Sequence, residues 1–311
     1  MGLYLVTGGA GFIGSHLTER LVQLGHTVRV LDDFSTGRRE NLAGLERQVE
    51  LIAGDIRDPQ TVRQAVAGVE AVLHLAARAS VPRSVEHPRE ANDVNVNGTL
   101  NLLLAARDTG VRRFIYSASS SAYGDSPALP KAETMPPRPL SPYAASKLAG
   151  EHYCACFAAV YGLETISLRY FNVFGPRQDP HSPYAAVIPA FVSRMLRGQK
   201  PIVFGDGEQS RDFCYIENVV RANLLALAAP RLAGEVVNIA CGERVTLNQI
   251  IRLINQHLGT DIQPEYQAPR PGDVRHSLAS LEQARRVLGY QPQVFFADGL
   301  ARSIAWYRQN L

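Results

Sequence analysis

The chain has 311 residues, of which 46% are hydrophobic and 20% charged, and its formal net charge at pH 7 is +3. This composition is ordinary for a globular protein, and the charge is too small to indicate nucleic-acid binding. A chain of this length exceeds the roughly 250–300 residues at which a single hydrophobic core stops growing, so we expect two lobes.

The first half of the chain alternates short apolar runs with helical patterns. The predicted strands are residues 3–6, 27–31, 49–52, 71–75, 114–116 and 164–170. The predicted helices are one that ends near Gly25, then 58–67, 95–109 and one introduced by Ser141 and Pro142. Strands that alternate with helices favour an α/β fold of the Rossmann type, with a doubly wound parallel sheet.

The alternation weakens after residue 170, where turn-rich pieces surround predicted helices at 218–229 and 247–258. We expect residues 1–172 to form a dinucleotide-binding domain, to which segments around 201–240 return. Residues 173–311 should mainly form a smaller α/β cap over the carboxyl ends of the strands, where open α/β sheets hold ligands.

Residues 124–142 contain six prolines. A disordered linker and a stiff surface loop both fit this composition. We favour the loop, because the segment joins the strand that ends at Ser119 to the helix that carries Tyr143.

The four cysteines show no disulfide framework and no metal-ligand spacing. Cys154 and Cys156 would point about 200° apart on a helix, so we expect two buried thiols and no metal site. The amino terminus runs into a predicted strand without a basic region or cleavage site. No apolar run approaches the ~20 residues that span a bilayer. We therefore expect a cytoplasmic protein without a membrane or nucleic-acid partner.

Gly8, Gly11 and Gly14 lie between the first predicted strand and helix. Glycines allow a tight turn there and let a pyrophosphate approach the N-terminus of the helix. Asp32 ends the second strand, where a carboxylate binds an adenosine ribose and repels a 2′-phosphate. We expect NAD as the cofactor, although Arg38 and Arg39 leave NADP open.

Two further strand ends fit the same cofactor. Asp55 follows the third strand and is placed to bond the adenine amine. Leu75, Ala76 and Ala77 follow the fourth strand and let the cofactor pass close to the backbone. Plain packing at a helix start is the alternative explanation for the two alanines.

Tyr143 and Lys147 are four residues apart on a predicted helix, so their side chains share a face. Lowering a tyrosine pKa from about 10 to about 7 requires about 4 kcal/mol. One positive charge about 5.5 Å away supplies about 3 kcal/mol at an effective dielectric constant of about 20. Lys147 together with an oxidised nicotinamide is therefore sufficient, and Ser119 is placed to hold the same substrate oxygen.

Taken together, these motifs resemble the extended short-chain dehydrogenases/reductases and, within them, the nucleotide-sugar 4-epimerases. The stretches that carry the resemblance are residues 7–14, 119–124, 143–147, 168–176, 210–213 and 270–273. The triple serine at 119–121 and the run at 211–218 are most similar to UDP-N-acetylglucosamine 4-epimerases.

The resemblance implies a mechanism in which Tyr143 removes the proton of the sugar 4-OH while C4 gives a hydride to tightly bound NAD. The 4-keto sugar then turns about its phosphate bond and takes the hydride back on the other face. The resemblance also implies a homodimer formed by the helices that begin near Asn95 and Tyr143. Leu100, Leu103 and Leu104 suit such an interface, and they suit a domain core equally well.

The resemblance assigns further residues to the two ligands. The additional cofactor contacts that it implies are Phe12, Ile13, Asp33, Phe34, Ser35, Gly37, Ile56, Asn95, Ser117, Tyr143, Lys147, Tyr170 and Val173. The substrate contacts that it implies are Ser80, Ser119, Ser120, Ser121, Tyr143, Asn172, Ala186, Val187, Arg211, Arg270, Asp273 and Ser277. In this set Asn172, Arg211 and Arg270 bind the diphosphate, Asp273 binds the uridine ribose, and Ala186 and Val187 lie beside the uracil.

The residue at position 277 matches the position that gates the sugar 2-substituent in these epimerases. Serine is small and leaves room for an acetamido group, so N-acetylated UDP-hexoses are expected substrates beside UDP-glucose and UDP-galactose. A UDP-uronate 4-epimerase is the alternative, with Arg78 or Arg83 on the carboxylate. A dehydratase or decarboxylase would want an acidic residue where Ser120 and Ser121 stand, and a non-catalytic NAD sensor predicts a broken Ser/Tyr/Lys set.

Overall fold

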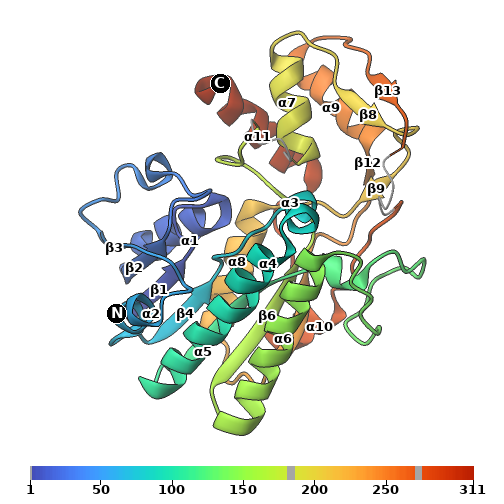
Figure 1. Ribbon diagram of the computed structural model, residues 1–311. Helices are drawn as coiled ribbons and strands as arrows, with labels where there is room; N and C mark the ends of the chain where they lie inside the picture. Colours follow the sequence, from blue (N-terminus) through green and yellow to red (C-terminus); the bar gives the residue numbers. More distant parts are fainter. Residues whose placement is uncertain (1, 181–185, 270–274) are drawn as a thin grey trace.

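A seven-stranded parallel sheet forms the centre of the molecule, in the order β11-β6-β5-β4-β1-β2-β3 (Figure 1). The computed structural model describes residues 2–180, 186–269 and 275–311. The strands are β1 (Leu3–Thr7), β2 (Thr27–Asp32), β3 (Val49–Ala53), β4 (Ala71–His74), β5 (Arg113–Ser119), β6 (Glu164–Tyr170) and β11 (Glu235–Ile239). The predicted α/β fold is confirmed.

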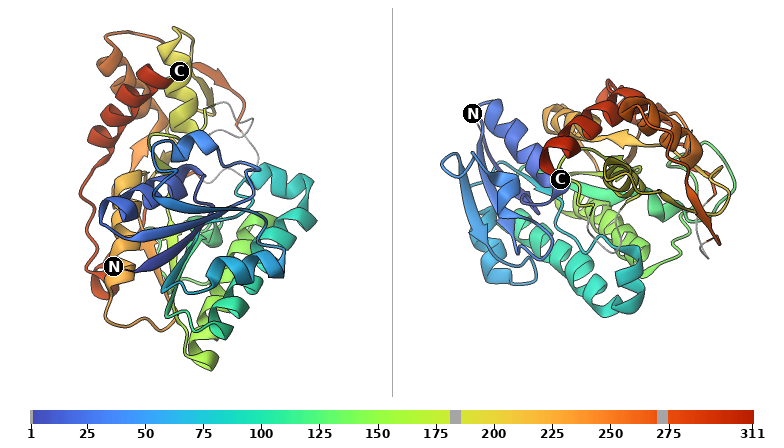
Figure 2. Two further views of the ribbon diagram at one scale, coloured as in Figure 1. Left: turned by 90° about the vertical axis from the view of Figure 1, so that its left-hand side faces the viewer. Right: turned by 90° about the horizontal axis from the view of Figure 1, so that it is seen from above.

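Helices cover both faces of this sheet (Figure 2). On one face α2 (Pro59–Val66), α5 (Thr99–Asp108) and α6 (Pro142–Tyr161) pack in a row. On the other face α1 (Phe12–Gln23) packs beside α8 (Ile216–Ala228). Every residue of β4 is buried, as expected for a strand covered from both sides.

Two elements differ from their predicted extents. The helical region expected at 95–109 begins earlier, as α3 (Val81–Glu86), α4 (Pro88–Asn92) and the π-helical turn η2 (Asp93–Gly98), which runs into α5. The strand expected at 114–116 is the seven-residue β5. Polar Ser117 and Ser119 at its carboxyl end interrupt the apolar pattern, because that end lines a cavity.

The second lobe lies beyond the carboxyl ends of the strands (Figure 1). Its helices α7 (Val187–Leu196), α9 (Leu247–Leu258) and α11 (Phe296–Asn310) pack on one another. Its short ladders pair β8 (Ile202–Phe204) with β13 (Glu265–Gln267), and β9 (Ser210–Arg211) with β12 (Val245–Thr246). The ladder of β7 (Val173–Phe174) with β10 (Cys214–Tyr215) follows β6. The remaining elements are η1 (Arg39–Leu42), η3 (Ser120–Tyr123) and α10 (Glu282–Leu288), which packs on β11.

The proline-rich segment 124–142 is an ordered loop and not a disordered linker. Lys131 is 2% exposed, and its backbone pairs with Leu278 and Ser280 through bonds of 2.7 and 2.8 Å. Glu133 accepts a bond of 2.7 Å from the backbone N–H of Asn238. These contacts tie the loop to the second lobe and to the end of the central sheet.

The prediction for the cysteine pair on α6 is wrong in one half. Cys154 is buried against the sheet, whereas Cys156 is exposed. Two positions on a helix that differ by two residues cannot both face the same sheet. Within the three described ranges, no helix has the combination of length and apolarity that crossing a bilayer requires.

Candidate active site

The turn between β1 and α1 is closed by glycines. Gly8 has a φ of +68°, and a Cβ there would lie 2.8 Å from the backbone nitrogen of Ala76. A Cβ on Gly14 would collide with the carbonyl oxygen of Gly8. The N-terminal turn of α1, whose N–H groups and dipole attract anions, can therefore be approached closely at this point.

A cavity of about 990 Å³ along the carboxyl ends of the strands is lined by this glycine turn and by Tyr143 and Lys147. The expected cofactor residues in its wall are Gly8, Gly11, Phe12, Ile13, Gly14, Asp32, Asp33, Phe34, Ser35, Gly37, Asp55, Ile56, Leu75, Ala76, Ala77, Ser117, Tyr143, Lys147, Tyr170 and Val173. A single cavity that contains both an anion cradle and a phenol fits an elongated dinucleotide.

Asp32 is held rigidly at the wall of this cavity. It is 6% exposed, and its carboxylate accepts bonds of 2.9 Å from the backbone N–H groups of Ala10 and Phe34. Burial raises its pKa, and the two backbone bonds act in the opposite direction. A carboxylate in this position accepts bonds from ribose hydroxyls and disfavours a phosphate in their place.

The two arginines that left NADP open are engaged elsewhere. Arg38 forms an ion pair of 2.8 Å with Asp179 across the cavity rim. The guanidinium of Arg39 lies 4.2 Å from the centre of the Phe34 ring. Each guanidinium group thus has a partner within the protein and does not need a 2′-phosphate, which supports NAD as the cofactor.

Ser119, Tyr143 and Lys147 all line this cavity. Ser119 ends β5, while Tyr143 and Lys147 occupy successive turns at the start of α6. The Ser141 hydroxyl caps this helix by accepting a bond of 3.1 Å from the N–H of Ala144. The N–H of Tyr143 donates to the Ser84 hydroxyl at 3.0 Å, so the start of the helix is held on two sides.

The protonation of this group is governed by burial more than by the neighbouring lysine. Burial raises the pKa of Tyr143, and the hydrogen bond with Ser119 is the influence that opposes it. Burial lowers the pKa of Lys147 to about 8, while Glu151 and Cys154 act to raise it. The lysine ammonium lies 4.4 Å from the centre of the Tyr116 ring. The sequence argument that Lys147 acidifies the phenol is therefore incomplete for the protein alone.

A buried ion pair lies one helical turn beyond Lys147. Glu151 and Arg169 are 3% and 4% exposed, and two parallel bonds of 2.9 and 2.7 Å join them. Glu151 follows Lys147 by four residues on α6, so the two side chains share a face. The spacing of Tyr143, Lys147 and Glu151 would have revealed this acid in the sequence, and sequence reasoning missed it.

On the side of the second lobe, Asn172 and Ser277 are joined to Asp212. The Asn172 amide donates to the Asp212 carbonyl at 2.9 Å and to the Ser277 hydroxyl at 3.3 Å. Asn172 lines the cavity, so Ser277 is one hydrogen bond behind its wall.

The other expected residues lie away from the cavity wall. Asn95 is 1% exposed and bonds both the backbone of Arg78 and the Ser146 hydroxyl. Ser80 caps α3, and the Ser121 hydroxyl donates to Ser119 at 2.8 Å. The remaining ones are Ser120 in η3, Ala186 and Val187 at the start of α7, and Arg211 in β9. Arg270 and Asp273 lie outside the described residues.

Some residues of the wall had no signal in the sequence. Arg177, Gln178 and Asp179 reach the cavity from the segment after β7. Arg177 is fixed there by an ion pair of 2.6 Å with Glu19 on α1. This contact joins residues 158 positions apart, so no local pattern predicts it.

Comparisons with known proteins agree with this geometry. Residues 4–240 match the model of the NAD dependent epimerase/dehydratase family. The chain is 42% identical to a UDP-glucose 4-epimerase of Mycolicibacterium smegmatis, over 98% of each chain. It is 39% identical to the solved UDP-N-acetylglucosamine 4-epimerase of Methanobrevibacter ruminantium in complex with UDP-N-acetylmuramic acid, with a TM-score of 0.96 and coverage of 100% and 99%. It is also 39% identical to the Thermus thermophilus UDP-glucose 4-epimerase complex with NAD, with a TM-score of 0.90 and coverage of 99% and 100%.

Proposed function

The chain belongs to the NAD-dependent epimerase/dehydratase family, and from this membership and the site we propose that it catalyses the 4-epimerisation of a UDP-hexose. The observation that carries the proposal is one continuous cavity. Its wall contains the glycine turn and Asp32 together with Ser119, Tyr143 and Lys147. The reaction proceeds through a transient 4-keto sugar and has no net redox change.

In this mechanism each of the three residues has a distinct task. Tyr143 takes the proton of the 4-OH and later returns one to the 4-keto oxygen. Ser119 donates a hydrogen bond to the same oxygen and keeps it against the phenol. Lys147 is a buried cation that stabilises the phenolate. Bound NAD supplies the hydride acceptor and, when oxidised, a second positive charge beside the phenol. Catalysis is then largely proton transfer and positioning.

The second lobe holds the nucleotide while the sugar turns. We place Asn172, Arg211 and Arg270 on the diphosphate, since charge-assisted bonds from arginine are strong and directional. Asp273 is assigned to the uridine ribose, and Ala186 and Val187 to the uracil. Anchoring at the diphosphate leaves the pyranose free to present either face to Tyr143.

Ser277 supports the acceptance of N-acetylated sugars. Its hydroxyl is bonded to the Asn172 amide and lies 3.4 Å from the backbone nitrogen of Asp212, so the small side chain is fixed in place. A bulky residue at 277 would take space beside Asn172, and the small serine is what leads us to propose that a 2-acetamido group is accepted.

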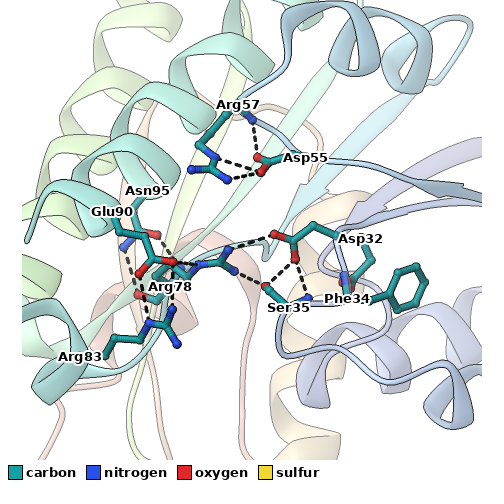
Figure 3. A network of polar contacts seen from close by, with 10 residues as sticks. Asp32, Phe34, Ser35, Asp55, Arg57, Arg78, Arg83, Glu90 and Asn95 are labelled. Atoms are coloured by element: carbon teal, nitrogen blue, oxygen red, sulfur yellow. Dashed lines mark hydrogen bonds and ion pairs between the residues drawn. The ribbon is translucent and has the colours of Figure 1, made fainter. Parts of the chain in front are cut away.

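The contacts of Arg78 and Arg83 support a neutral hexose over the uronate alternative. Arg78 and Arg83 both donate to the carboxylate of Glu90, at distances between 2.9 and 3.2 Å (Figure 3). Arg78 also pairs with Asp33. An additional carboxylate would have to compete with acids that already neutralise these guanidinium groups, so we favour a neutral hexose.

The test is turnover of UDP-glucose, UDP-galactose and their two N-acetylated counterparts by the purified protein, with no cofactor added. We expect epimerisation in all four cases and NAD bound to the protein as purified. Turnover of UDP-glucose alone would overturn the role of Ser277. Turnover of UDP-glucuronate alone would select the uronate alternative, and a need for added NAD with accumulation of NADH would indicate a net dehydrogenase.

The matched substitution is Tyr143→Phe. We expect a loss of activity of about 10³-fold, because a phenyl ring cannot accept the proton. Tyr161→Phe at the exposed end of the same helix is the control and should retain full activity. Undiminished epimerisation by the Tyr143 variant would remove the chemical basis of the proposal.

We further propose a homodimer formed by α5 and α6 of two copies. Leu100 and Leu104 are partly exposed on α5, whereas Leu103 is buried in the core of the sheet lobe and does not take part. The cytoplasmic location stays a prediction from the sequence.

A further inference from the structure

A network centred on Arg78 crosses the cofactor cavity (Figure 3). Its guanidinium donates to the Ser35 hydroxyl, to the Asp33 carboxylate at 3.1 Å and to the Glu90 carboxylate at 2.9 Å. We call these four residues the Arg78 strap. Arg78, Asp33 and Ser35 all line the cavity that holds the glycine turn.

The strand order shows what the strap spans. In the sheet β1 lies between β2 and β4. Asp33 and Ser35 follow β2, Arg78 follows β4, and the glycine turn follows β1. A bond from Asp33 to Arg78 therefore passes over the carboxyl end of β1, where a dinucleotide lies against the N-terminus of α1.

The strap is anchored on the β4 side by more than one bond. The Asn95 side chain accepts a bond of 2.7 Å from the Arg78 N–H and donates one of 3.2 Å to the Arg78 carbonyl. The Glu90 carboxylate on α4 accepts a hydrogen bond from the Arg78 guanidinium. It also accepts two hydrogen bonds from Arg83. The Arg78 side chain is only 13% exposed, and those of Asp33 and Glu90 are 28% and 25% exposed.

We propose that Arg78 is a positioning residue that retains NAD through the catalytic cycle, by strapping the β2 loop to the β4 loop over the bound dinucleotide. The proposal rests on the proposed epimerase function, in which the hydride must return to the same sugar. If the reduced cofactor left before the hydride returned, the 4-keto sugar could not be reduced to product. Both binding and release of the dinucleotide require the strap to open.

The experiment compares Arg78→Ala with the unmodified enzyme by measuring NAD content after purification and the rates of NADH binding and release by fluorescence. We expect release to accelerate about tenfold or more, because charge-assisted bonds of partly buried groups are lost. Binding to protein stripped of cofactor should accelerate as well, because the strap also restricts access. Arg78→Lys, which can replace only part of the fork, should fall between the two.

The matched control is Arg57→Ala. Arg57 also pairs with an aspartate at this rim, Asp55, but the two residues are neighbours on one loop and their bond does not cross the cavity (Figure 3). Its rates should equal those of the unmodified enzyme.

Three outcomes would contradict the proposed role of the Arg78 strap. Unchanged release in Arg78→Ala would mean that the network does not restrain the cofactor. Faster release with unchanged binding would mean that Arg78 only contacts the dinucleotide. Equal effects in Arg57→Ala would indicate a general loosening of the rim. If the unmodified protein binds no NAD, the proposed function itself fails, and this result is distinct from the other three.

Discussion

At the scale of single residues, burial sets the pKa of Lys147 and one neighbouring acid opposes it. Glu151 raises the pKa of Lys147, which burial has lowered to about 8. In Glu151→Gln the pKa of Lys147 should fall further, and less of the lysine is charged at neutral pH. We expect the alkaline limb of the kcat/KM profile to move down by about 1 pH unit or more. The measurement is the pH dependence of epimerisation between pH 6 and pH 9.

Two further variants serve as controls for this prediction. Glu50→Gln removes an exposed acid that pairs with Arg29 far from the cavity wall, and it should leave the profile unchanged. Glu151→Gln leaves Arg169 buried without its partner, which is costly, so the double variant Glu151→Gln/Arg169→Gln should be compared as well. An alkaline limb that stays in place in both folded variants would show that Glu151 does not act on Lys147.

At the scale of elements, one buried carboxylate joins three segments that lie far apart in the sequence. Asp212 accepts bonds of 2.9, 3.0 and 3.1 Å from the N–H groups of Cys241, Gly242 and Ala279. Asp212→Asn places an N–H group against these donors. We expect a loss of about 2–3 kcal/mol in the free energy of unfolding. We also expect a larger rise in KM than fall in kcat, because the Asn172 and Ser277 contacts loosen.

Urea unfolding and steady-state kinetics test this expectation. Asp206→Asn is the matched control, since Asp206 lies in the same lobe but is exposed and pairs with Arg275 at the surface. Its stability should change by less than about 1 kcal/mol. Equal stabilities of the two variants would show that Asp212 does not hold these segments together.

At the scale of the whole molecule, the sheet lobe presents apolar side chains on its outer helices. Val160 and Tyr161 at the end of α6 are 70% and 51% exposed, and Leu104 on α5 is partly exposed. If two copies pair through these helices, Leu104→Lys should convert the dimer to a monomer. The measurement is molar mass by light scattering. Leu24→Lys at the C-cap of α1, where the side chain is 46% exposed, should stay dimeric. A monomeric unmodified protein would contradict the pairing.

The features that the sequence determined by itself are local in the chain. Gly8 and Gly14 lie within one turn and the helix that follows it, so their spacing alone indicated the cofactor cradle. Tyr143 and Lys147 share a helix face whatever the rest of the chain does. Alternation of strands and helices determined the parallel sheet for the same reason. Such patterns follow from the fixed periods of helix and strand.

The tertiary structure alone decided the contacts between distant segments. Arg78 and Asp33 are 45 positions apart in the sequence. They meet because β2 and β4, the strands that they follow, are both neighbours of β1 in the sheet. The Arg78 side chain therefore reaches from the loop after β4 to the loop after β2. The pKa of Tyr143 likewise depends on burial, which a spacing of four residues does not reveal. The periodicity of a helix or strand determines which face of that element a side chain lies on. The order of the strands in the sheet determines which distant residues that side chain contacts.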